Sequence, residues 1–158
     1  SLIGMIIYIT IRFEFSFAIG AVVGLLHNLL ITIGLYCLFH RQFNMTTIAA
    51  LLTVLGYSVN DTIVVFDRIR ETRKLRQGRL DADIVNESVN ITLSRTLLTS
   101  LTTLLSVTAL MIFGGGAIFD FALAMSIGVV AGTYSSTFIA SPVMLAVRPK
   151  DTPGQSKK

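Results

Sequence analysis

Long apolar segments separated by short polar links make up most of the chain. They fall at residues 2–11, 15–39, 45–66, 95–113 and 117–147. The last four are long enough to cross the hydrocarbon core of a bilayer, which is about 30 Å thick, because a helix rises about 1.5 Å per residue. The first covers only about half of that thickness. We therefore predict four full spans, preceded by one truncated N-terminal span.

The polar residues between these segments predict the remaining organisation. Residues 67–94 begin with a basic stretch and continue with apolar positions at helical spacing, which is typical of a loop followed by a helix on the membrane surface. Asp81 and Asp83 are the candidate caps of that helix. Residues 148–158 form a basic tail, so residues 1–147 are predicted to form one transmembrane domain.

The composition indicates an all-α membrane protein. Of the 158 residues, 53% are hydrophobic and 14% are charged, and the mean hydropathy is +0.73. A soluble domain of this size would be far more polar. Continuous apolar runs favour helices over a barrel of transmembrane strands, which would show short alternating segments. The predicted fold class is therefore a polytopic transmembrane helix bundle.

The net charge of +4 is better explained by topology than by nucleic-acid binding. Six cations lie within twelve residues after the third apolar segment, and the tail carries four more. By the positive-inside rule, loop 67–94 and the C-terminus are expected on the cytoplasmic side of the inner membrane, with Arg41 outside. Contact of the loop with anionic membrane lipids is a secondary expectation, and no nucleic-acid partner is expected.

Asp61 is the residue of greatest interest, because it lies inside an apolar span. It belongs to the stretch GYSVNDTIVVFDRIRE, residues 56–71. An ionised acid near the bilayer centre costs roughly 2.5–3.5 kcal/mol on insertion scales, so an acid there is by default functional. The alternative is a residue that only holds helices together. The polar residues of this span recur on one stripe, which should face neighbouring helices: Thr46, Thr53, Tyr57, Asn60 and Asp61.

Other polar or small residues within the spans allow further expectations. Arg95 shares a helical face with Thr99, Thr102 and Ser106, and it is either a boundary residue or a functional one. His27 is interpreted as a neutral residue bonded across helices rather than as a proton relay. Two GxxxG spacings should allow close helix packing: Gly20 with Gly24, and Gly128 with Gly132. The single Cys37 allows no disulfide framework, and neither a metal nor a cofactor is expected.

The stretch GYSVNDTIVVFDRIRE is very similar to the signature of the SecF family of protein-export membrane proteins, in the resistance-nodulation-division superfamily. The resemblance continues through RFEFSFAIGAVVGLLHNLLITIGL before it and SRTLLTSLTTLLSVTALMIFGGGAIFDFALAMSIGVVAGTYSS after it, and thus covers most of the chain. It implies that the chain corresponds to membrane helices two to six of such a protein. The family's first helix and its periplasmic domain are not matched.

The resemblance also implies partners and a role. SecF proteins work with SecD, fused or separate, and use the proton-motive force to complete the translocation of polypeptides leaving the SecYEG channel; YajC is a further implied partner. The exported polypeptide would be held by the periplasmic domain. An arginine in the matching SRTL context acts there with the signature aspartate, so Arg95 becomes the expected partner of Asp61. The supporting polar residues would be Asn60, Thr62, Tyr57, Thr99 and Thr102.

The resulting hypothesis is that protonation of Asp61, sensed through Arg95, moves the helices and an attached periplasmic domain. The family often carries an aspartate where this chain has Asn28, so Asn28 is given no role. Two alternatives stay open: a non-conducting structural half of the bundle, and another proton-coupled transporter of the superfamily. An enzyme is not expected, because aspartyl proteolysis needs two carboxylates, and TYSS with His27 is a poor basis for a Ser–His pair.

Overall fold

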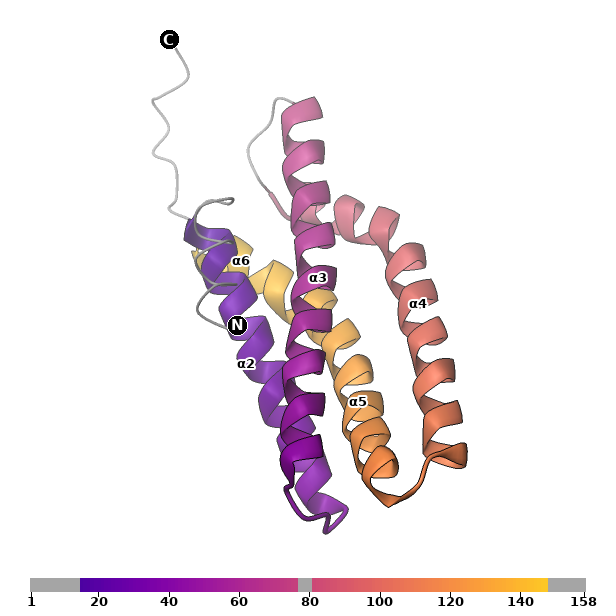
Figure 1. Ribbon diagram of the computed structural model, residues 1–158. Helices are drawn as coiled ribbons and strands as arrows, with labels where there is room; N and C mark the ends of the chain where they lie inside the picture. The colour runs from indigo at the N-terminus through magenta and orange to yellow at the C-terminus, as the bar shows by residue number, and fades with distance from the viewer. Residues whose placement is uncertain (1–14, 77–80, 148–158) are drawn as a thin grey trace.

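The computed structural model describes residues 15–76 and 81–147. These residues form helices α2 (Phe15–Leu38), α3 (Met45–Leu75), α4 (Ala82–Phe113) and α5 (Gly116–Ser135), followed by the π-helix η1 (Ser136–Ala140) and α6 (Ser141–Val147). The predicted segment 2–11 and tail 148–158 lie outside the described residues. Figure 1 shows the long helices side by side, with α5 packed against α2, α3 and α4.

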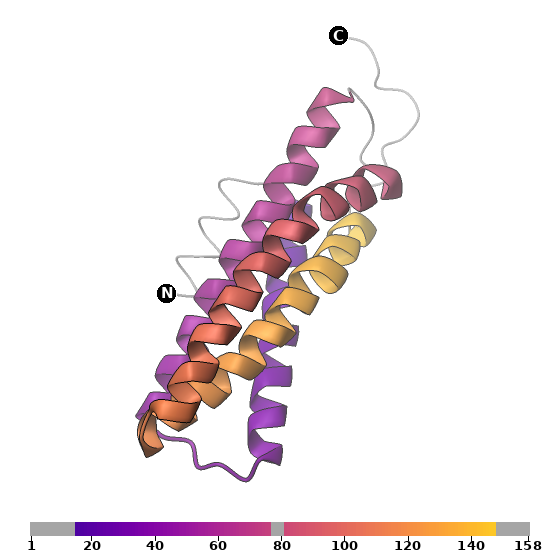
Figure 2. The same ribbon diagram turned by 90° about the vertical axis from the view of Figure 1, so that its right-hand side faces the viewer.

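Four of these helical stretches have the length and apolar character needed to cross a membrane: α2, α3, α4 and the continuous run Ile118–Val147. The prediction of an all-helical membrane bundle with four full spans is therefore confirmed. The view in Figure 2 shows the same helices running along one common direction. The protein is accordingly a multi-pass membrane protein.

The helices α3 and α4 are longer than the hydrophobic pattern predicted. The end of α3 extends from residue 66 to Leu75, into the predicted loop. The predicted surface helix is the first part of α4, which begins at Ala82 and continues without a break into the fourth span. Side-chain interactions support these polar turns: Arg68 pairs with Glu71 at 2.6 Å, and Asp81 accepts a 2.9 Å hydrogen bond from the Ile84 amide as the cap of α4. The first turns of α4 cross the end of the bundle before the helix bends along it (Figure 1).

Polar contacts tie the helix ends together at the opposite end of the bundle. Asn44 caps α3 by accepting a 2.8 Å hydrogen bond from the Thr47 amide. Its own amide donates to Asp120 near the start of α5 at 3.4 Å. Arg41 lies 3.4 Å from the same carboxylate and its guanidinium sits 4.7 Å above the Phe119 ring. The α2–α3 link is therefore fastened to α5.

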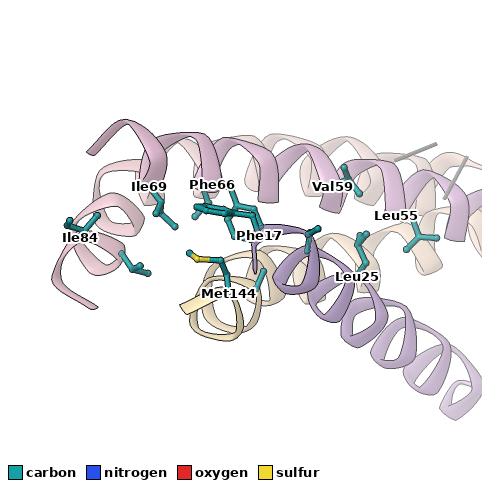
Figure 3. Close-up of a cluster of buried hydrophobic side chains, with 13 residues drawn as sticks. Phe17, Leu25, Leu55, Val59, Phe66, Ile69, Ile84 and Met144 are labelled. Atoms are coloured by element: carbon teal, nitrogen blue, oxygen red, sulfur yellow. The ribbon is translucent and has the colours of Figure 1, made fainter. Parts of the chain in front are cut away.

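Two apolar clusters fill the interior. The basic-end cluster lies mainly at the end that carries the cations of α3, where the Phe17 and Phe66 rings meet edge to face at 5.2 Å and Met144 packs beside them (Figure 3). Its buried members are Phe17, Ala18, Ala21, Leu25, Leu55, Val59, Val65, Phe66, Ile69, Ile84, Val85, Ala140 and Met144. The opposite cluster consists of Tyr36, Ala50, Val54, Val107, Ala124, Met125 and Val129.

The predicted close-packing glycines lie at helix contacts. A Cβ on Gly20 of α2 would stand 2.6 Å from the Ala140 carbonyl oxygen, and one on Gly132 of α5 would stand 2.9 Å from Nδ2 of Asn28. Since real Cβ atoms do not approach other atoms so closely, any larger residue would push α2 away from α5 and η1. The expectation of close approach at these glycines is confirmed.

Candidate functional site

Asp61 faces the interior of the bundle. Its neighbours on the buried stripe of α3, Val54, Ser58 and Val65, recur at helical spacing, and all three are at most 1% exposed. Asp61 itself is 8% exposed, and it is the one acidic or basic residue among the buried residues of the described ranges. The expectation that this acid faces other helices rather than lipid is confirmed.

Two hydroxyl groups from other helices bind the Asp61 carboxylate. The Thr96 hydroxyl of α4 donates to Oδ1 at 2.9 Å, and the Ser136 hydroxyl of η1 donates to Oδ2 at 2.5 Å. Both donors are 1% exposed. These two hydrogen bonds satisfy both oxygens of an acid that is removed from water. We call Asp61, Thr96 and Ser136 the acid layer.

A second set of hydroxyl groups lies about one helical turn away, on α3, α4 and α5, the helix that η1 continues. Tyr57 of α3 donates to the Ser100 hydroxyl of α4 at 3.4 Å, and the hydroxyls of Ser100 and Thr133 of α5 are 2.6 Å apart. Tyr57, Ser100 and Thr133 precede or follow the acid-layer residues by three or four positions, always toward the opposite end of the bundle. We call them the hydroxyl layer.

Apolar residues enclose both layers along each helix. On α3 the layers lie between Val54 of the opposite cluster and Val65 of the basic-end cluster. The same order holds on α4, between Val107 and Val85, and on the last span, where Val129 precedes the layers and Ala140 follows them. Both layers therefore lie between apolar positions in the middle part of the bundle, and on α4 the buried hydroxyl residues Ser88 and Thr92 lie between the acid layer and Val85.

Helix α2 adds an unusual amide to this zone. Asn28 is fully buried, and Oδ1 accepts a 3.3 Å hydrogen bond from Thr32, but Nδ2 has no hydrogen-bond partner. The neighbouring His27 was expected to bond across helices, and that expectation is wrong for the described residues. Its Nδ1 is buried without a partner, and the aromatic neighbour of its ring is Tyr134, at 6.3 Å between centroids.

Arg95 does not reach Asp61 in this structure. Its side chain is exposed, and within residues 15–76 and 81–147 it makes no ion pair with the acid. Consecutive residues of a helix point about 100° apart, so when Thr96 meets Asp61 its neighbour turns outward. Thr99 and Thr102 share that exposed face, and each donates its hydroxyl to the backbone of α4 itself, at 3.0 Å and 3.1 Å.

Some of the other predicted supporting residues face the interior of the bundle, and others are exposed on its surface. Tyr57 takes part in the hydroxyl layer, and Thr62 is buried but donates to the Ser58 carbonyl at 2.9 Å instead of to Asp61. Asn60 and Thr53 are exposed, so the prediction of one inward polar stripe on α3 is wrong for these two. They lie to one side of the buried stripe, which contains Val54, Ser58 and Asp61.

Sequence reasoning missed Ser136, Thr96 and Ser100. The signal for Ser136 was present in TYSS, where two consecutive serines stand in the middle of a predominantly apolar span. Thr96 and Ser100 were hidden because α4 carries hydroxyl residues around most of its circumference. Among the described residues, no group of three His, Cys, Asp or Glu side chains could hold a metal ion.

Pro142 accounts for the local shape of the chain beside Ser136. Proline has no backbone N–H and its ring collides with the carbonyl four residues earlier, so an α-helix cannot run through it undisturbed. The five residues before α6, Ser136–Ala140, widen into the π-helix η1. Such single wide turns inside a helix are frequent at functional sites. Ser136, the donor to Asp61, is the first residue of this turn.

Comparisons with known proteins identify the family. A family model described as "Protein export membrane protein SecD/SecF, C-terminal" matches residues 1–150. The protein translocase subunit SecF of Cereibacter sphaeroides is 51% identical over 142 residues, which cover 90% of this chain and 44% of that protein. The subunit of the same name from Petrotoga mobilis is 50% identical over 147 residues, covering 93% and 49%. The chain thus spans less than half of each of these relatives.

Solved structures agree with this assignment. A crystal structure of SecDF in the super-membrane-facing form superposes with a TM-score of 0.84 at 46% identity, covering 92% of this chain and 20% of that one. The crystal structure of SecDF from Thermus thermophilus, described as a translocon-associated membrane protein, gives 0.83 at 47% identity, covering 89% and 20%. The chain therefore belongs to the SecD/SecF family of protein-export membrane proteins.

Proposed function

We propose that this chain is the membrane-spanning part of a SecF subunit, which together with SecD uses the proton-motive force to drive late stages of polypeptide translocation across the cytoplasmic membrane. Relatives named protein translocase subunit SecF support the export role, and similarity to SecDF structures supports SecD as the partner. The observation that carries proton coupling is Asp61, a buried acid held by hydroxyls of two other helical elements inside a membrane bundle.

The proposed topology follows from the distribution of charge. The basic end of α3 carries Arg68, Arg70, Arg73, Lys74 and Arg76, whereas Arg41 lies at the opposite end beside Asp120. By the positive-inside rule the basic end and the C-terminus are cytoplasmic. The hydroxyl layer then lies on the outer side of the acid layer.

The proposed coupling works through the hydrogen bonds of the acid layer. When Asp61 is ionised, both carboxylate oxygens accept, which links α3 to α4 and to η1. When it takes up a proton, it becomes a donor itself, and one of the two hydroxyls must turn away. Each proton that crosses the membrane makes about 2.3 kcal/mol available per 100 mV, enough to favour one helix packing over another.

Arg95 belongs to this proposal as the residue whose position on the exposed face changes when the hydrogen bond of Thr96 to Asp61 changes. It adjoins Thr96, so any rotation of α4 that alters the Thr96–Asp61 bond also moves the guanidinium on the exposed face. In the complete assembly we place this face against the SecD half. The SecYEG channel, YajC and the exported polypeptide are the further proposed partners, and the proposed role is transport of protons and polypeptide, not enzymatic catalysis.

A matched pair of carboxylate substitutions tests the function. The full-length protein and its SecD are reconstituted with SecYEG in proteoliposomes, and proton flux and proton-dependent export are measured with Asp61→Asn and with Asp67→Asn. Both changes remove one negative charge from α3, but Asp67 is exposed. We expect Asp61→Asn to abolish both activities and Asp67→Asn to retain them. Unchanged flux and export with Asp61→Asn would refute the proposal.

One observation favours a second candidate, the non-conducting structural half of the bundle. The carboxylate is only 8% exposed and both of its oxygens are satisfied within the chain, as a purely stabilising residue would be. In that case Asp61→Asn would lower the thermal stability and yield of the SecD–SecF complex, while the proton flux per assembled complex would stay at the wild-type level. Measuring both quantities on the same preparation separates the two candidates.

A further inference from the structure

Ser136 has two acceptors within reach of a single hydroxyl proton. Its Oγ lies 2.5 Å from Oδ2 of Asp61 and 3.2 Å from the Thr133 carbonyl oxygen. A serine hydroxyl donates one hydrogen bond and accepts others. Ser136 can therefore donate to an ionised Asp61 or, after turning about its Cβ–Oγ bond, donate to Thr133 and accept from a protonated Asp61. Both arrangements use atoms that are already in place.

Thr96, the other donor of the acid layer, has no such second acceptor among the described residues. Its hydroxyl makes one hydrogen bond, to Oδ1 of Asp61. When Asp61 gains a proton, the change in bonding is therefore expected at Oδ2 and Ser136. The arriving proton binds Oδ2. Ser136 keeps its own proton and redirects its hydrogen bond from Oδ2 to the Thr133 carbonyl oxygen.

The backbone around Ser136 is suited to respond to that change. Ser136 begins η1, and the wide turn is bordered by Pro142, which lacks an N–H, and by Ser141, whose hydroxyl donates to the Ser136 carbonyl at 3.4 Å. On its other side the turn rests against a glycine surface of α2, where Gly20 faces the Ala140 carbonyl. A glycine surface places no side chain in the way of a sliding backbone.

We propose that Ser136 is a positioning residue whose hydrogen bond changes with the charge of Asp61. This change alters how the segment 136–147 packs against α2, so that the packing differs between the two charge states. The inference rests on the proposed function, because it needs Asp61 to gain and lose a proton. It adds the group that senses the proton and the segment that moves.

Titratable side chains on the helices around Asp61 do not take this role in the structure. They include Tyr57 on α3, Arg95 on α4, Tyr134 on α5 and His27 on α2. None of them makes a hydrogen bond or an ion pair with the carboxylate within the described ranges. Ser136 is the contact of Asp61 that has an alternative partner, so it is the group expected to change first.

Infrared difference spectroscopy of the reconstituted full-length protein with SecD can test this. A pH change should produce the carbonyl band of the protonated Asp61 carboxyl, identified by its loss in Asp61→Asn. In Ser136→Ala we expect this band at a higher frequency, because the acid loses a hydrogen-bond partner. We also expect the pH at which the band reaches half of its full intensity to change by about one to two units, which corresponds to the free energy of one hydrogen bond to a charged group. Ser136→Thr, which keeps the hydroxyl, should restore both properties.

Ser135→Ala is the matched control. Ser135 is also fully buried, but its hydroxyl donates to the Gly24 carbonyl of α2 at 2.6 Å instead of to Asp61. It should therefore leave the band unchanged even if it costs stability. A band that is unaltered in Ser136→Ala would overturn the inference while leaving the proposed function intact. Absence of any titrating Asp61 band in the wild type would overturn both.

Hydrogen–deuterium exchange tests the moving segment. After correction for the intrinsic pH dependence, amides of residues 136–147 should exchange at different rates in the two charge states of the wild type, and in Ser135→Ala. The difference should disappear in Ser136→Ala and return in Ser136→Thr. A difference that persists in Ser136→Ala would contradict the assignment of Ser136 as the connecting residue.

Discussion

Thr96 donates a 2.9 Å hydrogen bond to Asp61, across the contact between α4 and α3. This bond, and not an ion pair with the adjacent Arg95, is what the carboxylate receives from α4. Within the helix bundle, Asp61 is therefore held by neutral hydroxyl groups. The charge of the arginine remains on the outer surface of the helix.

A double-mutant cycle should detect the Thr96–Asp61 bond. We expect Thr96→Val to lower the unfolding free energy of the full-length protein by about 1–2 kcal/mol, because a buried acceptor loses its donor. The loss should shrink when Asp61→Asn is already present. Thermal unfolding in detergent measures it, with Thr99→Val as control, since the Thr99 hydroxyl is exposed and bonds only to its own helix.

Substitution of Arg95 should separate function from stability. Its side chain is exposed and without an ion pair in the described residues, so Arg95→Ala should change the unfolding free energy of the isolated subunit by no more than about 0.5 kcal/mol. Proton-dependent export by the complete SecD–SecF assembly should nevertheless fall strongly. An export rate equal to that of the wild type would remove Arg95 from the coupling proposal.

Two glycines of α2 should respond oppositely to alanine. At Gly20 a Cβ would stand 2.6 Å from the Ala140 carbonyl oxygen, whereas at Gly34 nothing lies within 4 Å. Gly20→Ala should therefore destabilise the protein by about 1–3 kcal/mol through overpacking. Gly34→Ala should be neutral or stabilising by up to about 1 kcal/mol, since alanine favours helix. Thermal unfolding of the two variants side by side tests the contact; equal stabilities would argue against it.

The two aspartates at the start of α4 offer a similar contrast. Asp81 accepts the hydrogen bond of the Ile84 amide, and Asp83 makes no capping bond. Asp81→Ala should cost about 1 kcal/mol, and Asp83→Ala only a few tenths from its charge near the helix start. Amide exchange at residues 84–88 should rise in Asp81→Ala alone. A larger increase in Asp83→Ala would show that Asp83, and not Asp81, caps the helix.

Much of this fold could be predicted from the sequence, because spans are set by hydropathy, which the sequence displays directly. The helix ends were predicted less well. Hydropathy marks where a chain leaves the lipid, whereas the helix α3 continues through polar turns supported by Arg68 and Glu71. The cap at Asp81 was predictable because it depends on local chemistry alone.

The site was predictable in its central residue but not in its partners. Asp61 stood out because an acid in an apolar span is costly. Its partners Thr96 and Ser136 depend on how helices far apart in sequence rotate against one another. A helix that carries polar residues at adjacent positions, such as Arg95 and Thr96, does not reveal which of them faces inward. The family resemblance emphasised the arginine, while the packing selects the threonine.

The position of the acid layer between two apolar clusters has an electrical consequence. Hydrocarbon side chains have a low dielectric constant, so in an energised membrane the field is steepest across the clusters and shallow across the hydroxyl-rich zone between them. Under the proposed function, a proton bound at Asp61 would have passed through only a fraction of the total voltage drop, and the remaining fraction would act when it departs. Arrival and departure would then each be voltage-dependent steps, with the carboxylate as the binding site between them.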